Sequence, residues 1–167
     1  ISNYLALPGK NLLVSGSETA FDLGIGSAAD IAFLNLKLRA AYVGDSAGTY
    51  LATGVAGGPF ASITSLSFSP ATGARYNAEF PDRLGTINGS TAVLRYSGGT
   101  ADTAAVTYTD PISRSRVIMM GFPLEAVSSV TAGGVTSTGA RAVGVILSPA
   151  ADFFFPNVGW YLSLIHI

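Results

Sequence analysis

Two short apolar runs, far apart in the sequence, constrain the fold of this chain more than any other feature. They are Asn11–Ser15 and Arg116–Gly121. A nearly continuous apolar run of this length is typical of a strand that is buried on both faces of a sheet. We therefore predict that the two runs are neighbouring strands of one sheet, with helices on both of its faces.

Apolar residues at helical spacing follow the first run and also close the chain. The spacing predicts helices over Glu18–Leu23, Ala28–Leu36 and Ser137–Phe154, and a short N-terminal helix that ends at Pro8. Pro149 is expected to kink the closing helix because it has no backbone N–H. The positions of that helix predicted to face the core are Ala142, Val145, Ile146 and Phe153.

The middle of the chain consists of short runs rich in β-branched and aromatic residues, separated by turn residues. Asn88-Gly89 and Ser97–Thr100 are predicted to close tight hairpins. Together with the apolar runs and the helices, this pattern predicts a single α/β domain with inserted antiparallel hairpins. The predicted strands of this middle part are Arg39–Val43, Thr49–Thr53, Ile63–Phe68, Ala92–Ser97 and Ala104–Thr109.

Charge and composition exclude several classes of protein. Nine Lys and Arg residues face ten Asp and Glu residues, and all are scattered, so the basic stripe that nucleic-acid binding needs is missing. The absence of Cys excludes disulfides, thiolate metal sites and a Cys nucleophile. The uncharged residues 46–74 are interrupted throughout by Gly, Ser, Thr and Pro, so we expect no membrane insertion. No spacing matches a cofactor or metal motif, and neither group is predicted.

Both ends of the chain have the character of a cut metagenomic fragment. The last six residues, Leu162–Ile167, match the translation of a sequencing-library adapter. We therefore expect residues 162–167 to be a non-native tail. His166, the sole histidine, lies in this tail, so we expect the native domain to have no histidine available for catalysis. The N-terminal helix opens without a cap, so we expect the native domain to continue upstream of Ile1.

The turn after the first run is a candidate nucleophile site. It contains Ser15 and Ser17, and a sharp strand-to-helix turn presents a nucleophile beside backbone N–H donors. A structural role is favoured over the catalytic one, because Ser15 and Glu18 have the spacing of a helix capping box.

The second candidate is Glu125, which follows the second run. A carboxylate at the carboxyl end of a central strand lies where open α/β sheets bind ligands. An acid in the first turn of a helix is also stabilised by the helix dipole, and both roles stay open. Asp45, Asp82, Asp102 and Asp110 lie beside turn residues, where Asp is expected to bond its own backbone.

Aromatic residues on the predicted strands suit stacking on a sugar, so a carbohydrate is one ligand class we consider, although strand aromatics more often pack a core. They are Tyr42, Tyr50, Tyr96 and Tyr108, considered together with Tyr76, which lies between two predicted strands, and Trp160 near the end of the chain.

Three segments, residues 4–17, 78–82 and 117–125, and the closing helix with Arg141 carry a family resemblance. The chain resembles the C-terminal half of a class I glutamine amidotransferase-like domain of the kind found in large secreted bacterial proteins. The resemblance implies a three-layer, flavodoxin-like α/β fold over residues 1–161, with the first strands of the domain missing. It also implies an extracellular or cell-envelope location, and other domains of the same parent chain as partners.

The resemblance further implies that the catalytic chemistry has been lost. Active members have a Cys at the first turn and a His and a Glu after the late strand. Here Ser15 or Ser17 falls near the Cys position, Pro123 replaces the His, and Glu125 keeps the acid. A serine needs a neighbouring base to act as a nucleophile. The resemblance therefore implies a non-catalytic binding or structural module.

Two alternatives stay open. The first is a hydrolase or lyase acting on polysaccharide or peptidoglycan, with Ser15 and Glu125 completed by residues from the missing N-terminal part. It requires both side chains to meet in one cleft. The second is an all-β adhesin module, which predicts that the strand at residues 117–120 lies outside a helix-covered sheet.

Overall fold

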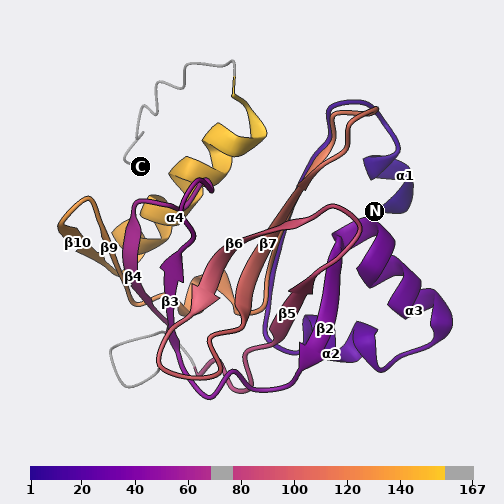
Figure 1. The fold of residues 1–167 in the computed structure, drawn as a ribbon. Coiled ribbons are helices and arrows are strands. Elements are labelled where there is room, and N and C mark those ends of the chain that lie inside the picture. The colour runs from indigo at the N-terminus through magenta and orange to yellow at the C-terminus, as the bar shows by residue number, and fades with distance from the viewer. Residues whose placement is uncertain (69–76, 157–167) are drawn as a thin grey trace.

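The computed structural model describes residues 1–68 and 77–156, in which one mixed sheet of ten strands carries helices on both sides (Figure 1). The chain is therefore a sheet-rich α/β protein. The helices are α1 (Ser2–Leu5), α2 (Thr19–Gly24), α3 (Ala28–Phe33), η1 (Leu34–Leu38), η3 (Leu124–Ala126) and α4 (Ala140–Phe154). The strands are β1 (Asn11–Ser15), β2 (Ala40–Gly44), β3 (Leu51–Gly54), β4 (Ile63–Ser67), β5 (Arg83–Thr86), β6 (Thr91–Tyr96), β7 (Thr103–Thr109), β8 (Arg116–Met120), β9 (Ser129–Ala132) and β10 (Val135–Thr138).

The strands lie in the order β1-β8-β7-β6-β3-β4-β9-β10, and β5 pairs with both β7 and β2 beside this path. The prediction that the two apolar runs are neighbours is confirmed, because β1 and β8 are parallel, with Asn11 opposite Arg116 and Ser15 opposite Met120. The other recorded strand pairs are antiparallel. The carboxyl ends of β1 and β8 therefore open at the same edge of the sheet.

Burial on both faces is confirmed for β8 and wrong for β1. Residues 117–120 of β8 are buried, whereas every residue of β1 is only half-buried. The reason is position, because β1 has β8 as its only strand neighbour within the described residues. Leu12 and Val14 still pack against one core and Leu13 against the other, so β1 separates two hydrophobic layers.

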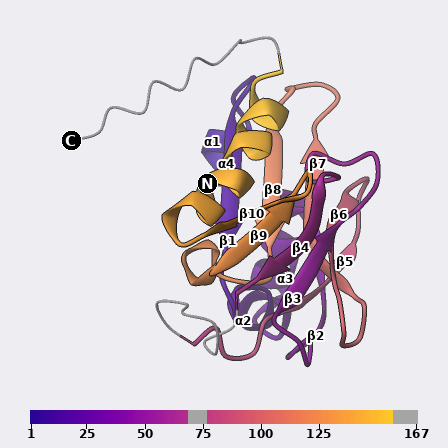
Figure 2. The same cartoon turned by 90° about the vertical axis from the view of Figure 1, so that its left-hand side faces the viewer.

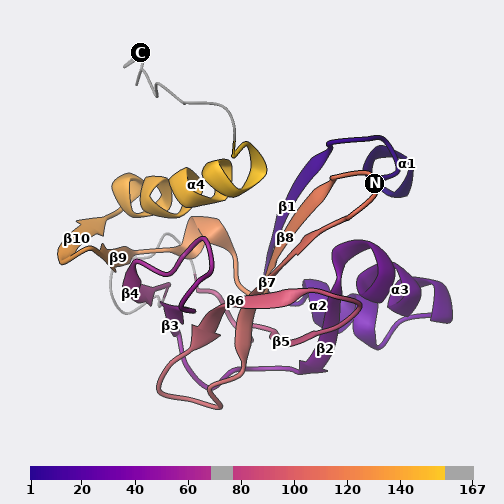
Figure 3. The same cartoon turned by 45° about the horizontal axis from the view of Figure 1, so that its top comes forward.

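Two cores lie on opposite faces of the sheet, with α2 and α3 on one side and α4 on the other (Figures 1 and 3). The larger core contains Phe68 and Phe122, both fully buried and stacked with their ring centroids 4.6 Å apart. The smaller core contains Leu34 and Leu38 from η1 and Met119 from β8. Because helices cover both faces of β8, the all-β alternative is wrong.

The predicted helices are present, but their boundaries differ. The N-terminal helix ends at Leu5 and not at Pro8, and the helix from Ala28 is α-helical to Phe33 and continues as a π-helix to Leu38. Ser137 and Thr138 belong to β10, so the closing helix begins at Ala140, and Pro149 lies inside it. α4 begins beside β9 and β10, and its last turn reaches β1, where the Asn11 amide donates to the Phe154 carbonyl (Figure 2). No helix in residues 1–68 and 77–156 combines the length and apolar content needed to cross a bilayer.

The hairpin predictions have different outcomes. Ser97–Thr100 joins β6 to β7, which are antiparallel, so this hairpin is confirmed. Asn88 and Gly89 both have positive φ, and the Ser90 N–H donates to the Ile87 carbonyl, so a tight turn forms there. No direct pairing joins β5 to β6, however, because β5 pairs with β2 and β7 instead. The prediction that Asn88-Gly89 closes a hairpin of two paired strands is therefore wrong.

A close contact at the end of β8 requires glycine and gives a first prediction. A Cβ on Gly121 would lie 2.2 Å from the carbonyl oxygen of Asp82 and 3.1 Å from the Tyr96 hydroxyl. Overpacking a tight site of this kind costs about 1–3 kcal/mol. We expect Gly121→Ala to lower the free energy of unfolding, measured by urea denaturation, by at least about 2 kcal/mol.

Gly144 in α4 offers a matched control. A Cβ there would meet no atom within 4 Å, and alanine favours a helix over glycine by about 0.5–1 kcal/mol. Gly144→Ala should therefore leave stability unchanged or raise it. Equal stabilities of the Gly121→Ala and wild-type chains would show that the backbones are not held this close in solution.

Candidate functional site

Ser15 ends β1 and contacts the segment that follows β8. Its Oγ accepts a hydrogen bond from the Leu124 N–H at 3.3 Å. The predicted capping box is wrong: α2 begins after Glu18, which has a left-handed backbone, and no side chain of the N-cap residue caps the helix. Ser15 instead contacts the connection that follows the neighbouring strand β8. The chain does form a capping box one helix later, between Ser27 and Asp30 at the start of α3.

Glu125 lies in η3, the single helical turn after β8. Its side chain is exposed, and it occupies the first turn of η3, whose N-cap is the buried Pro123. Glu125 therefore occupies the first helical turn that one of its two open roles requires.

Ser15 and Glu125 line one cavity of about 410 Å³ at the carboxyl ends of β1 and β8. The two residues are far apart in sequence but meet there because parallel strands end at the same sheet edge. Ser17 lies in the turn before α2 and is not among the lining residues. The remaining walls come from η3, the residue after it, and the first turns of α4: Leu124, Val127, Gly139, Ala140 and Val143.

The chemistry of this cavity is that of a hydroxyl, a carboxylate and a helix N-terminus above apolar walls. The N-cap residue of α4, Gly139, has no side chain, so no side-chain cap is present there. The backbone N–H groups of a first helical turn are donors that lack partners within the helix. The arrangement can hold a polar ligand by hydrogen bonds, but the lining contains no imidazole or amine to accept a proton from Ser15.

Asp82 is a buried carboxylate near the carboxyl ends of β1 and β8, and the sequence did not indicate its burial or its contacts with α2. Asp82 is fully buried, and its carboxylate accepts the Ala20 N–H at 2.7 Å and the Phe21 N–H at 3.2 Å, which caps α2 from outside the helix. Its own N–H donates to the Gly121 carbonyl at 2.7 Å. The expectation that Asp82 bonds its own turn is therefore wrong, although Asp110 does so through the N–H groups two and three residues on.

Burial raises the pKa of Asp82 to about 7, and the nearby Glu18 and Asp45 carboxylates add to the rise, while the two N–H donors of α2 oppose it. Burial also raises the pKa of Glu18, and Asp45 and Asp22 contribute to that rise. The acidic groups gather around the start of α2. Across residues 1–68 and 77–156, no set of three or more suitable side chains is placed to hold a metal ion.

The aromatic residues considered for sugar stacking have mainly structural positions. Tyr96 is buried, and its hydroxyl donates to the carbonyls of Asp82 and Gly121. Tyr50 packs edge-on against Phe68. Tyr76, Trp160 and the predicted tail at 162–167 lie outside the described residues.

Comparison of the chain with protein-family models, with curated proteins and with solved structures finds no match. The chemistry of the cavity is therefore inferred from its own residues.

The buried carboxyl of Asp82 predicts an unusual pH dependence of stability. An unfolded Asp has a pKa of about 3.9, so between about pH 4 and pH 7 the folded chain holds a proton that the unfolded chain has lost. The stability from this group is complete below pH 4 and is lost as the pH rises through 7. One such proton is worth up to about 1.4 kcal/mol per pH unit. We expect the free energy of unfolding to fall by roughly 2 kcal/mol between pH 5 and pH 8.

Asp82→Asn isolates this effect because it keeps the size of the side chain and removes the titration. The variant loses one cap to α2 and should be less stable at pH 5, but its stability should vary less with pH over the same interval. Urea denaturation at each pH measures both slopes. Parallel slopes for the two proteins would mean that Asp82 is ionised throughout.

Proposed function

We propose that this chain is a non-catalytic, amidotransferase-like module, acting in ligand binding or as a structural unit, of a larger exported bacterial protein. The finer fold we propose is a three-layer, flavodoxin-like domain. The parallel β1–β8 pair supports it, as do the helices on both sheet faces and the cavity at the carboxyl ends of the pair. Ligands of open α/β sheets bind at this edge.

The observation that carries the proposal is Pro123. It stands between β8 and η3, where the resemblance places a histidine, and its ring has no group that exchanges a proton. The single histidine of the sequence, His166, lies outside the described residues. A serine hydroxyl is a weak nucleophile unless an adjacent base removes its proton.

The hydrogen bonding of Ser15 also supports a non-catalytic role. Its oxygen receives the Leu124 N–H, which draws electron density away from the atom that would attack a substrate. The bond instead ties the end of β1 to η3. Ser15 thereby fixes the wall of the cavity in which Glu125 lies.

A hydrolase or lyase is the second candidate, and the shared cavity favours it. Ser15 and Glu125 line the same space, which is the arrangement that this alternative requires. A carboxylate is the one general base that the lining supplies, and acid–base catalysis by Glu is common in glycoside and polysaccharide chemistry.

A hydrolysis screen separates the two candidates. The full-length parent protein is assayed with glutamine, peptidoglycan and neutral and acidic polysaccharides, beside its Ser15→Ala and Glu125→Gln variants. We expect no glutaminase activity and no turnover that depends on either residue. Ser17→Ala is the matched control, because Ser17 lies in the same turn but outside the cavity lining. Turnover that disappears in Ser15→Ala and survives in Ser17→Ala would overturn the proposal.

A further inference from the structure

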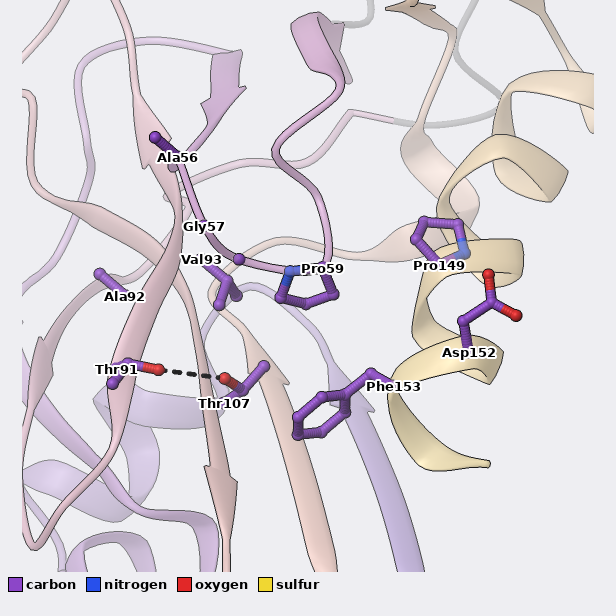
Figure 4. Close-up of a pocket in the computed structure, with 11 residues that line it drawn as sticks. Ala56, Gly57, Pro59, Thr91, Ala92, Val93, Thr107, Pro149, Asp152 and Phe153 are labelled. Carbon is purple, nitrogen blue, oxygen red and sulfur yellow. Dashed lines mark hydrogen bonds between the residues drawn. The ribbon is translucent and has the colours of Figure 1, made fainter. Parts of the chain in front are cut away.

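A second and larger cavity, of about 670 Å³, lies between the sheet and the C-terminal half of α4 (Figure 4). It shares no lining residue with the cavity at Ser15. Its volume falls within the range of about 300–1,000 Å³ that is usual for small-molecule sites. The inference drawn from it goes beyond the proposed function, because it does not depend on whether Ser15 is catalytic.

Three apolar rings, one of them aromatic, contribute to the wall of this cavity. Phe153 and Pro149 come from α4, and Pro59 comes from the connection between β3 and β4. In Figure 4 the Phe153 ring points from α4 toward Thr107, and Pro59 lies between the strands and the helix. The three rings present apolar surface to the same space.

The end of α4 that carries Phe153 is held in place by the sheet. The carbonyl of Phe154 accepts hydrogen bonds from Arg116 Nη1 at 2.7 Å and from Asn11 Nδ2 at 3.3 Å. The Arg116 guanidinium also lies 5.8 Å from the centroid of the Phe153 ring, and Phe154 packs against that ring. A platform that is ordered before binding reduces the entropy that a ligand must overcome.

A pair of hydroxyls lies opposite the rings. The Oγ1 atoms of Thr91 on β6 and Thr107 on β7 are 3.3 Å apart, and Thr107 is only 5% exposed. Each hydroxyl has one donor and two acceptor sites, so their mutual bond leaves one donor and three acceptor sites free. A wholly apolar ligand would desolvate these sites without replacing their hydrogen bonds, at a cost of about 1–3 kcal/mol.

The charge of the lining selects against anions. Asp152, which is exposed, is the one ionisable residue of the lining, and no Lys or Arg belongs to it. The lining therefore disfavours an anion and suits a ligand with one apolar face and hydroxyl groups at its edge.

From this geometry we infer that the cavity under α4 binds a sugar ring of a neutral oligosaccharide. The C–H face of the ring packs against Phe153, between Pro59 and Pro149. The ring hydroxyls exchange hydrogen bonds with Thr91 and Thr107, and those at the mouth reach the Asp152 carboxylate.

Isothermal titration calorimetry of the intact chain tests the inference. The probes are four neutral hexasaccharides (of cellulose, xylan, chitin and mannan) and, as the charged comparison, hexagalacturonate. At least one neutral probe should bind, and hexagalacturonate should bind more weakly or not at all. Phe153→Ala should weaken binding of that neutral probe by about ten-fold or more, and Thr91→Val by roughly three- to ten-fold.

Two features of the design keep the result decisive. Thr91 is exposed on a strand, so Thr91→Val reports on binding even where Phe153→Ala disturbs the packing of α4. Leu147→Ala is the matched control, because Leu147 is 45% exposed on the same helix and does not line the cavity; it should bind the neutral probe as the wild type does.

Three outcomes would overturn the inference: no neutral probe binds, the anionic probe binds better, or both Phe153→Ala and Thr91→Val bind at wild-type affinity. Loss of binding in Ser15→Ala with wild-type affinity in those two variants would place the sugar in the other cavity and also overturns it. None of these results changes the hydrolysis screen, so failure of this inference and failure of the proposed function are distinguishable.

Discussion

The junction of Asp82, Tyr96 and Gly121 is the contact on which the rest of the structure depends. Asp82 donates its N–H to the Gly121 carbonyl and accepts two N–H groups from the start of α2. The buried Tyr96 hydroxyl reaches both carbonyls, at 2.8 Å for Asp82 and 3.2 Å for Gly121. Two side chains, those of Asp82 and Tyr96, and the backbone at Asp82 and Gly121 thus join α2, β6 and the ends of β5 and β8. A buried polar network of this kind is stable only when its members are satisfied together.

This junction lies beside the cavity at the carboxyl ends of β1 and β8 and fixes the two segments that lead into its walls. Asp82 fixes the start of α2, which follows the turn after β1, and its N–H also holds the carbonyl of Gly121, from which the chain continues into Phe122 and Pro123. Phe122 is anchored in the larger core against Phe68. η3 then lies beside Ser15, whose hydroxyl receives the Leu124 N–H. The position of Glu125 is therefore a consequence of packing several residues away from it.

Sequence periodicity predicted the strands and helices that have an apolar pattern of their own. It failed for features that depend on contacts with residues far away in the sequence. β1, β8 and α4 have their own apolar patterns, and their common edge follows from two parallel strands, so the meeting of Ser15 with Glu125 could be predicted. β9 and β10 are short and rich in Ser and Thr. They pair with each other, and β9 joins the sheet by pairing with β4, more than sixty residues earlier. The role of Asp82 was hidden for the same reason, because its partners on α2 lie 61 and 62 residues away.

α4 contributes residues to the walls of both cavities. Its first turn forms a wall of the cavity at Ser15, through Gly139 and Val143, and its last turns form the wall that carries Phe153. The sheet holds both ends, since the Gly139 N–H donates to the Ser128 carbonyl at 3.0 Å and the Phe154 carbonyl accepts from β1 and β8. The position of each cavity wall that α4 supplies therefore follows from the hydrogen bonds that hold that end of the helix.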